Sequence, residues 1–350
     1  MAQNPYTTLF GMEPKESIRR TGEERTILDS FTADDTTQMM YMITGVRGSG
    51  KTVLLTDVAN RLREEKDWVV VEISSEGDIL LKIAAALSEE NKVARIFQNA
   101  SINLSAFGLG VEVKGRSQTT SMEITLGKMF ESLKKQKKRV LITIDEVVKS
   151  PGMKEFASAY QLYIRKKLPV FLLMTGLHEN IEDLQKEKNL TFLYRAPRIV
   201  LTPLNITAVM ENYKKRFGVD REKALEMARM TKGYPYAFQS LGYYVWENKK
   251  RLDDTILPEL RKQLEEYVYD IIWERLSDKD RLVAYGIAKT PSGKTAEIRK
   301  EIGLEPNEFN PYRKRLIKKG LINGKQWGVV TFTLPYFREY IIDMYEGIDY

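Results

Sequence analysis

Short apolar runs alternate with longer amphipathic runs through the first 200 residues of the chain. The apolar runs are nearly continuous, as in strands that are buried on both faces of a sheet. Strands that alternate with helices predict an α/β fold with a parallel sheet and helices on both sides. One segment, Ile102–Gly115, breaks the alternation, and its period-two pattern with glycines predicts a hairpin or a loose insertion. The expected strands are Met39–Thr44, Trp68–Ser74, Arg139–Asp145, Val170–Thr175 and Arg198–Thr202, and the expected helices are Gly50–Lys66, Ile79–Leu87, Glu123–Lys137 and Met153–Lys167.

The pattern changes after the fifth expected strand. Residues 207–276 repeat apolar side chains every three or four positions, which predicts a small all-helical bundle. From Ser277 onward, three helical runs precede a strand, a turn and a returning strand, which is the order of a winged helix-turn-helix. We therefore expect three domains, namely an α/β nucleotide-binding core at 1–202, a helical lid at 203–276 and a winged-helix domain at 277–350.

A glycine-rich stretch lies between the first expected strand and the first long helix. Its sequence, GVRGSGKT, has the spacing G-x-x-x-x-G-K-[ST] of a phosphate-binding loop. Glycines let the backbone curl so that N–H groups face phosphate oxygens, and the next helix adds the positive end of its dipole. Lys51 would contact the β- and γ-phosphates, and Thr52 would be a ligand of Mg²⁺. The alternative is a glycine-rich turn without a ligand. The predicted nucleotide-binding residues here are Gly45, Val46, Arg47, Gly48, Ser49, Gly50, Lys51, Thr52 and Val53.

An acidic pair follows the third expected strand. The stretch RVLITIDEV places Asp145 and Glu146 at the carboxyl end of a buried strand, the edge at which open α/β sheets bind ligands. Asp145 would contact Mg²⁺ through its water shell, and Glu146 would polarise the attacking water as general base. Thr175 ends the next strand, where its hydroxyl could reach the γ-phosphate or the water. Taken alone, the pair could be an exposed turn and Thr175 an ordinary strand residue.

Four motifs in this order, GVRGSGKT, VLITIDEV, FLLMTGL and TKGYPYAFQSLG, resemble those of the AAA+ ATPases. The chain is most similar to a prokaryotic branch, that of the archaeal Orc1/Cdc6-type initiators and the STAND signalling ATPases, and the resemblance covers nearly all of it. The resemblance implies ATP as the ligand and a strand order of 5-1-4-3-2. It also implies that Asp145 and Glu146 are the Walker B pair and that Thr175 is sensor 1.

The resemblance further implies roles for a lid proline and for an arginine. Gly233, Tyr234 and Pro235 match the G-x-P motif through which such lids meet the nucleotide, although a turn between helices can have the same sequence. Arg195 and Arg198 lie where these families carry an arginine finger, which completes the site of a neighbouring subunit. A finger would imply a homo-oligomer. Either arginine could equally be a surface or ion-paired residue.

One family motif is not matched. These families often carry a glycine-arginine-glutamate motif that contacts the adenine end of the nucleotide, whereas IRRTGEERTIL here has Glu23 directly after Gly22. Arg20 or Arg25 could substitute for the missing arginine. Recognition of adenine is therefore implied by the family and not by a visible pocket.

Composition excludes several other kinds of site. The 350 residues include no cysteine and a single histidine, His178. Disulfides, thiolate or multi-histidine metal sites, and Ser–His or Cys–His catalysis are therefore excluded within the chain. We expect His178 to be an ordinary surface or loop residue. The first residues lack a signal-peptide pattern and no apolar run has the length of a membrane span, so we expect a cytoplasmic protein without a membrane partner.

Positive charge is concentrated near the C-terminus. Residues 277–338 contain 13 Lys and Arg and 6 Asp and Glu, a net charge of +7 that equals the net charge of the whole chain. In a winged helix, the third helix can enter the major groove of double-stranded DNA while the wing touches the backbone. The alternatives are a module that contacts a protein and a merely solvated basic face. The candidate nucleic-acid residues are Asn310, Tyr312, Arg313, Lys314 and Lys325.

The sequence therefore supports two functions that share one nucleotide site. The first is an AAA+ ATPase that binds and hydrolyses ATP with Mg²⁺ and uses the nucleotide state to position a DNA-binding winged helix. The second is a STAND-like switch, in which exchange of ATP and ADP moves the lid and controls a protein partner with slow turnover. A scaffold that binds nucleotide without hydrolysis is a third possibility, and Glu146 argues against it.

Overall fold

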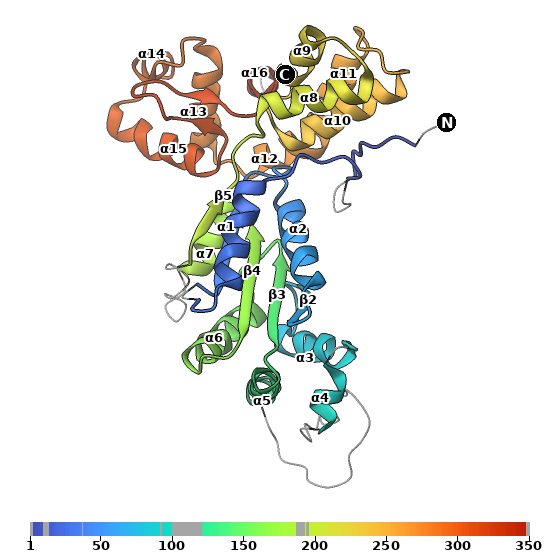
Figure 1. Ribbon diagram of the computed structural model, residues 1–350. Helices are drawn as coiled ribbons and strands as arrows, with labels where there is room; N and C mark the ends of the chain where they lie inside the picture. The colour runs from blue at the N-terminus through green and yellow to red at the C-terminus, as the bar shows by residue number, and fades with distance from the viewer. Residues whose placement is uncertain are drawn as a thin grey trace. The chain divides into compact units, whose positions relative to one another are not determined.

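The structure, a computed structural model, describes residues 3–9, 14–36, 38–91, 93–99, 121–186, 193 and 196–347. The expected hairpin at Ile102–Gly115 lies outside these residues, and so does Arg195. The chain divides into two compact units (Figure 1). The sheet unit comprises Arg20–Thr44 and Lys51–Val200, and the helical unit comprises Met1–Arg19, Gly45–Gly50 and Leu201–Tyr350.

In its described residues, the sheet unit is built on five strands that all pair in parallel. Their order is β2-β3-β4-β1-β5, so the predicted parallel sheet and the strand order implied by the family resemblance are both confirmed. The apolar runs form these strands because both faces of the sheet are covered by helices. The strands are β1 (Met40–Thr44), β2 (Trp68–Ser74), β3 (Arg139–Asp145), β4 (Val170–Gly176) and β5 (Arg198–Val200).

Seven helices accompany the strands in the described part of the sheet unit. Three of the expected helices begin at side chains that accept a hydrogen bond from the first turn, namely those of Asp78, Ser121 and Ser150. The pattern of apolar residues predicted α2, α3, α5 and α6, whereas α1, α4 and α7 were not predicted. The helices are α1 (Thr21–Thr32), α2 (Lys51–Glu64), α3 (Ile79–Glu89), α4 (Ala94–Asn99), α5 (Met122–Lys135), α6 (Pro151–Arg165) and α7 (His178–Gln185).

Both faces of this sheet carry a hydrophobic core. On one face, the Phe31 ring of α1 packs against strand aromatics, with ring centroids 5.6 Å from Tyr41 and 5.1 Å from Phe171. Trp68 completes this group, 4.8 Å from the Phe171 ring. Side chains of alternating strand residues, such as Met42, belong to the other core, to which α3, α5 and α6 contribute. Burial on both sides makes the sheet a rigid support for whatever its carboxyl edge holds.

The first part of the helical unit is the bundle that the sequence predicts at 207–276. A π-helical turn interrupts its last long helix, and turns of this kind recur at functional sites. Asn205 caps the first helix by accepting hydrogen bonds from two backbone N–H groups of its first turn. The elements are α8 (Ile206–Phe217), α9 (Arg221–Met230), α10 (Pro235–Glu247), α11 (Ile256–Leu264), the π-turn Glu265–Tyr269 and α12 (Asp270–Glu274).

The second part of the helical unit has three helices followed by a pair of antiparallel strands, as the pattern after Ser277 predicts. Lys294 adds a bridge to Val329, which widens the strand pair. A further helix, α16, was not assigned from the sequence, and its Tyr345 stacks on Tyr285 with ring centroids 4.1 Å apart. The elements are α13 (Asp278–Lys289), α14 (Thr295–Glu301), α15 (Pro306–Lys318), β6 (Ile322–Asn323), β7 (Thr331–Phe332) and α16 (Phe337–Glu346).

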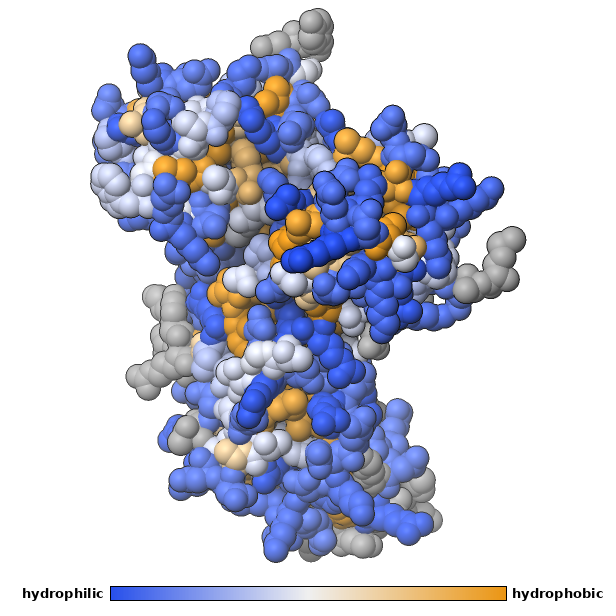
Figure 2. Space-filling view, turned by 45° about the horizontal axis from the view of Figure 1, so that its top comes forward, coloured by the Kyte–Doolittle hydropathy of each residue, from blue (hydrophilic) through white to orange (hydrophobic). Residues whose placement is uncertain are grey.

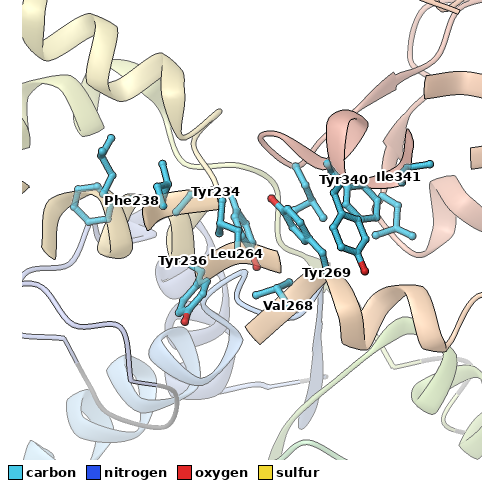
Figure 3. Close-up of a cluster of buried hydrophobic side chains, with 14 of the residues drawn as sticks. Tyr234, Tyr236, Phe238, Leu264, Val268, Tyr269, Tyr340 and Ile341 are labelled. Carbon is cyan, nitrogen blue, oxygen red and sulfur yellow. The ribbon is translucent and has the colours of Figure 1, made fainter. Parts of the chain in front are cut away.

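One core runs through the helical unit, from its first helices to its C-terminal elements. Figure 3 shows the centre of this core, where Tyr234, Val268, Tyr269 and Tyr340 lie near one another. The Tyr269 ring lies 5.5 Å from that of Tyr340, which α16 contributes. The bundle and the C-terminal elements are therefore packed together and do not have separate cores.

The N-terminal segment is part of the helical unit. Tyr6 is 3% exposed, and its ring stacks on Phe217 with centroids 5.6 Å apart. Its hydroxyl donates a hydrogen bond to Asn212 at 2.7 Å. The ring fits beside α10 because position 242 is glycine, and a Cβ there would lie 2.5 Å from it. Tyr6 thus fixes the start of the chain to the bundle.

The surface is mostly polar on the face drawn in Figure 2, with hydrophobic residues in separate patches. Among the large hydrophobic side chains that the structure describes, Trp327 is the most exposed, at 96%. No helix in the described ranges has both the length and the apolar character that crossing a bilayer requires.

Candidate nucleotide-binding site

The glycine-rich stretch forms a loop between β1 and α2. The strand ends at Thr44 and the helix begins at Lys51, as the motif requires. Gly48 and Gly50 have φ angles of +73° and +85°, in the left-handed region that side chains with a Cβ disfavour. The loop closes on itself, because the N–H of Ser49 donates to the carbonyl of Val46 at 3.2 Å. A backbone curled in this way can turn N–H groups toward an anion.

Two functional side chains of the motif stand at the start of α2. Lys51 and Thr52 occupy its first turn, where backbone N–H groups lack helical partners and the helix dipole is positive. Lys51 is 7% exposed, whereas Thr52 is exposed. The motif therefore combines a buried lysine with a helix N-terminus, an arrangement that is suited to an anion such as phosphate.

The acidic residues and both predicted threonines meet within the sheet unit. Thr52 Oγ1 donates a hydrogen bond to Asp145 Oδ2 at 2.8 Å. The Thr175 hydroxyl donates to the other carboxylate oxygen of Asp145. Asp145 ends β3 and Thr175 lies near the end of β4, so the parallel strands bring both to one edge of the sheet. The structure thus brings together three residues that are up to 123 positions apart in the sequence, from Thr52 to Thr175.

Glu146 follows Asp145 with an unusual backbone. Its φ angle is +50°, which is a strained value for a residue other than glycine. Hydrogen bonds hold this backbone: its N–H donates to Thr175 Oγ1 at 3.0 Å, and its carbonyl accepts from Ser75 Oγ at 3.2 Å. The side chain is exposed. Sequence reasoning missed Ser75, because nothing local marks a serine at the end of β2 as a support for Glu146.

The donor set suits magnesium more than a metal held by protein side chains alone. In the described ranges, no group of three or more His, Cys, Asp or Glu side chains is placed so that it could hold a metal ion. Thr52 and Asp145 instead offer one hydroxyl and one carboxylate, already in contact at 2.8 Å. Magnesium prefers oxygen ligands, keeps several waters and is completed by phosphates of the substrate. The residues therefore fit Mg²⁺ that arrives with a nucleotide.

The remaining predicted site residues lie in several places. Pro235 begins α10, and its ring atoms lie 3.9 Å from where a Cβ on Gly50 would be, within the helical unit. Arg198 donates a hydrogen bond to the side chain of Gln185 on α7. Arg195 lies outside the described residues. Near the expected adenine motif, Arg20 pairs with Glu23 at 3.6 Å.

The candidate nucleic-acid residues lie on α15 and beside the strand pair. Asn310 and Lys314 are exposed on α15, and Lys325 is exposed between the two strands. Tyr312 and Arg313 are half-buried.

Arg315 is another basic residue of α15. It forms an ion pair within the protein, with Asp280 of α13 at 2.9 Å.

These features define a P-loop nucleoside triphosphatase of the AAA+ type, with a parallel sheet in the order 5-1-4-3-2 and a glycine loop before α2. The chain belongs to the family described as "ATPase domain predominantly from Archaea", whose model matches residues 28–243. A second family model, a domain of unknown function (DUF8462), matches residues 266–341. No curated protein sequence matches the chain.

Solved structures have the same fold at low sequence identity. The Walker-type ATPase PABY2304 of Pyrococcus abyssi superposes with a TM-score of 0.61 at 17% identity, covering 92% of this chain and 95% of that one. The ORC2 protein of Aeropyrum pernix, solved as ADPNP-ADP complexes, also gives 0.61, at 15% identity over 97% and 96% of the two chains. The resemblance to AAA+ ATPases of this branch is thus confirmed, and at these identities the likeness concerns the fold alone.

Proposed function

We propose that this chain binds ATP together with Mg²⁺ and hydrolyses it. The observation that carries the proposal is the contact between Thr52 Oγ1 and Asp145 Oδ2 at 2.8 Å. It joins the end of the phosphate-binding motif to the acidic strand end, and these two residues would hold a magnesium ion that neutralises phosphate charge. Lys51 neutralises the β- and γ-phosphates, and the loop from Gly45 to Val53 surrounds them with backbone N–H groups.

Glu146 acts as the general base in this proposal. Its carboxylate is exposed, while its backbone is held by Thr175 and Ser75. A fixed backbone limits the region that the exposed carboxylate can reach, which favours catalysis by proximity. Magnesium supplies the charge that offsets the negative charge developing on the phosphates. Thr175 holds Asp145 and Glu146 in register and is the sensor in this arrangement.

The test is nucleotide binding and turnover in variants with a matched control. Lys51→Ala should lower the affinity for Mg-ATP at least roughly a hundredfold, because a buried charge opposite phosphate is lost. Lys294→Ala removes the lysine of a second Gly-Lys-Thr string, at 293–295, and should bind like the wild type. Glu146→Gln should retain ATP while hydrolysis slows by about 10²-fold or more. Wild-type binding by Lys51→Ala, or unchanged turnover in Glu146→Gln, would contradict the assignment.

We also propose that residues 277–350 form a winged helix that binds double-stranded DNA, following a core at 1–202 and a lid at 203–276. Three helices and an antiparallel strand pair, with Lys314 and Lys325 exposed, support this proposal. Trp327, between the strands, is 96% exposed. Its indole is not buried in the core, and an exposed apolar side chain of this size is typical of a binding surface. Asn310, Tyr312 and Arg313 would lie near the bases.

Salt dependence and charge reversal test DNA binding. The affinity of the full chain for a DNA duplex should fall steeply with salt, because released counterions drive the binding. The Lys314→Glu exchange should weaken binding strongly, since it replaces an attraction to phosphate by a repulsion. Lys279→Glu, an exposed lysine on α13, is the matched control and should change the affinity little. Absent or salt-insensitive binding would favour the alternative, a nucleotide switch that controls a protein partner.

One hydrogen bond is compatible with both the DNA-binding proposal and that alternative. Arg47 of the phosphate loop donates from Nε to the carbonyl of Tyr267 at 3.3 Å, in the π-helical turn of the same unit. A loop tied in this way to the helical unit would transmit its nucleotide state to that unit. This coupling serves a protein partner as well as it serves DNA.

A homo-oligomer is a further part of the proposal, with Arg195 or Arg198 as the finger. Activity per subunit should then rise with protein concentration, because the finger acts only where subunits meet. Arg198→Ala should remove this rise. The same substitution also breaks the hydrogen bond from Arg198 to Gln185, so a loss of activity could have a structural cause. The variant Gln185→Ala separates the two roles, since it breaks the internal hydrogen bond and leaves the arginine in place.

A further inference from the structure

One tyrosine of the helical unit forms a hydrogen bond with the backbone of the phosphate loop, residues 45–50. The hydroxyl of Tyr234 donates a hydrogen bond to the carbonyl of Arg47 at 2.6 Å. Tyr234 is 3% exposed and lies in the core shown in Figure 3, so its ring has little freedom to leave. It stands directly before α10, at a position that the sequence marks only as the variable residue of G-x-P.

A second contact holds the next carbonyl of the loop. The backbone N–H of Tyr236 donates to the carbonyl of Gly48 at 3.2 Å. Gly48 also has no room for a side chain, because a Cβ there would overlap the Tyr234 hydroxyl and lie 2.9 Å from the Tyr236 Cβ. Glycine at this position is thus required both by its φ angle of +73° and by the tyrosines that cover it.

These contacts fix the direction of the loop's N–H groups. In a trans peptide the C=O of one residue and the N–H of the next point in opposite directions. Because Tyr234 holds the Arg47 carbonyl, the N–H of Gly48 must point away from the tyrosine. Because Tyr236 holds the Gly48 carbonyl, the N–H of Ser49 is turned back, and it closes the loop on Val46 at 3.2 Å. The peptide planes that follow Arg47 and Gly48 are therefore both fixed by tyrosines of the helical unit.

We propose that Tyr234 is a positioning residue, whose hydroxyl holds the phosphate-binding loop in the conformation that receives a nucleoside triphosphate. The inference rests on the proposed function of that loop. It assigns to the lid a role on the outer side of the loop, separate from the contact with nucleotide that G-x-P implies for Pro235.

Two further properties suit Tyr234 to this task. Burial, and then the neighbouring Tyr236, raise the pKa of Tyr234 well above that of a free phenol. The group therefore remains a protonated donor throughout the neutral range. Its acceptor is a backbone carbonyl, so the bond does not depend on the side chain of Arg47.

The experiment compares two tyrosines that make the same kind of bond. Tyr234→Phe removes the hydroxyl and keeps the ring. Tyr213→Phe is the control, since Tyr213 is also buried and donates to a backbone carbonyl, that of Phe238, at 2.7 Å. We measure two quantities in the full chain: amide hydrogen exchange at residues 46–50 without nucleotide, and the Kd for Mg-ATP.

Tyr234→Phe should speed exchange at residues 46–50 and raise the Kd roughly five- to tenfold, as expected for one neutral hydrogen bond that orders a site. Tyr213→Phe should leave both unchanged, although the thermal stability of both variants falls to a similar extent. Unchanged exchange in Tyr234→Phe would overturn the positioning role, and so would equal effects in the two variants.

The two readouts also keep this inference apart from the proposed function. A wild-type chain that fails to bind Mg-ATP would overturn the proposed function, whereas the exchange measurement needs no nucleotide. Faster exchange with an unchanged Kd would overturn the inference, because the loop would then be ordered without consequence for binding.

Discussion

At the residue scale, close approaches decide which positions tolerate change. Gly242 lies inside α10, where glycine is normally unfavourable, and a Cβ there would be 2.5 Å from the Tyr6 ring. The glycine therefore serves the N-terminal segment and not the helix. Gly22 in α1 is the opposite case, because a Cβ there would meet nothing within 4 Å.

These two glycines give a matched prediction. Gly242→Ala should lower the free energy of unfolding by about 1–3 kcal/mol, because the methyl group displaces a packed ring. Gly22→Ala should raise it by roughly 0.5–1 kcal/mol, because alanine favours the helix and finds open space. Thermal or urea unfolding followed by circular dichroism measures both. A Gly242→Ala protein as stable as the wild type would mean that Tyr6 does not hold its place in solution.

For the candidate site, the sequence indicated some individual residues and missed others. Lys51, Thr52 and Asp145 could be predicted as candidates because each proposed role demands one residue type at a fixed place beside a strand or a helix, and the structure places Thr52 and Asp145 in contact. Tyr234 and Ser75 could not be named, since their roles depend on backbone groups far away in the sequence. A carbonyl acceptor leaves no mark on the residue that carries it.

At the element scale, α15 has two kinds of basic residue. Lys314 is exposed, whereas Arg315 pairs with Asp280, a carboxylate that is 2% exposed and also belongs to the capping box of α13. Arg315 further covers the Tyr312 ring at 4.8 Å. The charge of Arg315 is thus used inside the fold, and the count of basic residues overstates the charge that this helix offers to a partner.

Substitution by alanine should separate these two kinds. Arg315→Ala should cost roughly 1–3 kcal/mol of stability, because it leaves a buried carboxylate without its ion pair. Lys314→Ala should cost less than about 0.5 kcal/mol, as an exposed side chain on the same helix. Urea titrations with a common m-value give both numbers. Equal losses in the two variants would show that the pair with Asp280 contributes nothing.

The strands and long helices followed from the sequence because their signal is local. Continuous apolar runs predicted all five strands within two residues at each end, and capping side chains preceded three of the expected helices. The helix α16 was missed because its apolar residues follow directly after the strand pair, without a cap that accepts a hydrogen bond. The docking of Tyr6 was missed because the partners of that ring lie more than 200 residues away.

At the scale of the whole molecule, the grouping of the phosphate loop with the helical unit is the informative fact. Residues 45–50 belong to that unit, although β1 and α2 on either side belong to the sheet unit. Within the helical unit, the loop meets Tyr234 and Tyr236 and also the end of α15. A Cβ on Gly320, just after that helix, would lie 3.1 Å from Val46 of the loop. The loop therefore lies close to the residue that follows α15, the helix proposed to bind DNA.

This proximity predicts that nucleotide and DNA influence each other's binding. A nucleotide bound by the loop should strengthen or weaken the packing of Val46 near Gly320, so the affinity for a duplex should change by about fivefold or more when a non-hydrolysable ATP analogue with Mg²⁺ is present. By linkage, DNA must change the affinity for the analogue by the same factor, which gives an internal check. Lys51→Ala should bind DNA normally and lose the effect of the analogue. Two ligands that bind with unchanged affinities in each other's presence would show that neither the packing at Val46 nor the hydrogen bond from Arg47 to Tyr267 couples nucleotide to DNA.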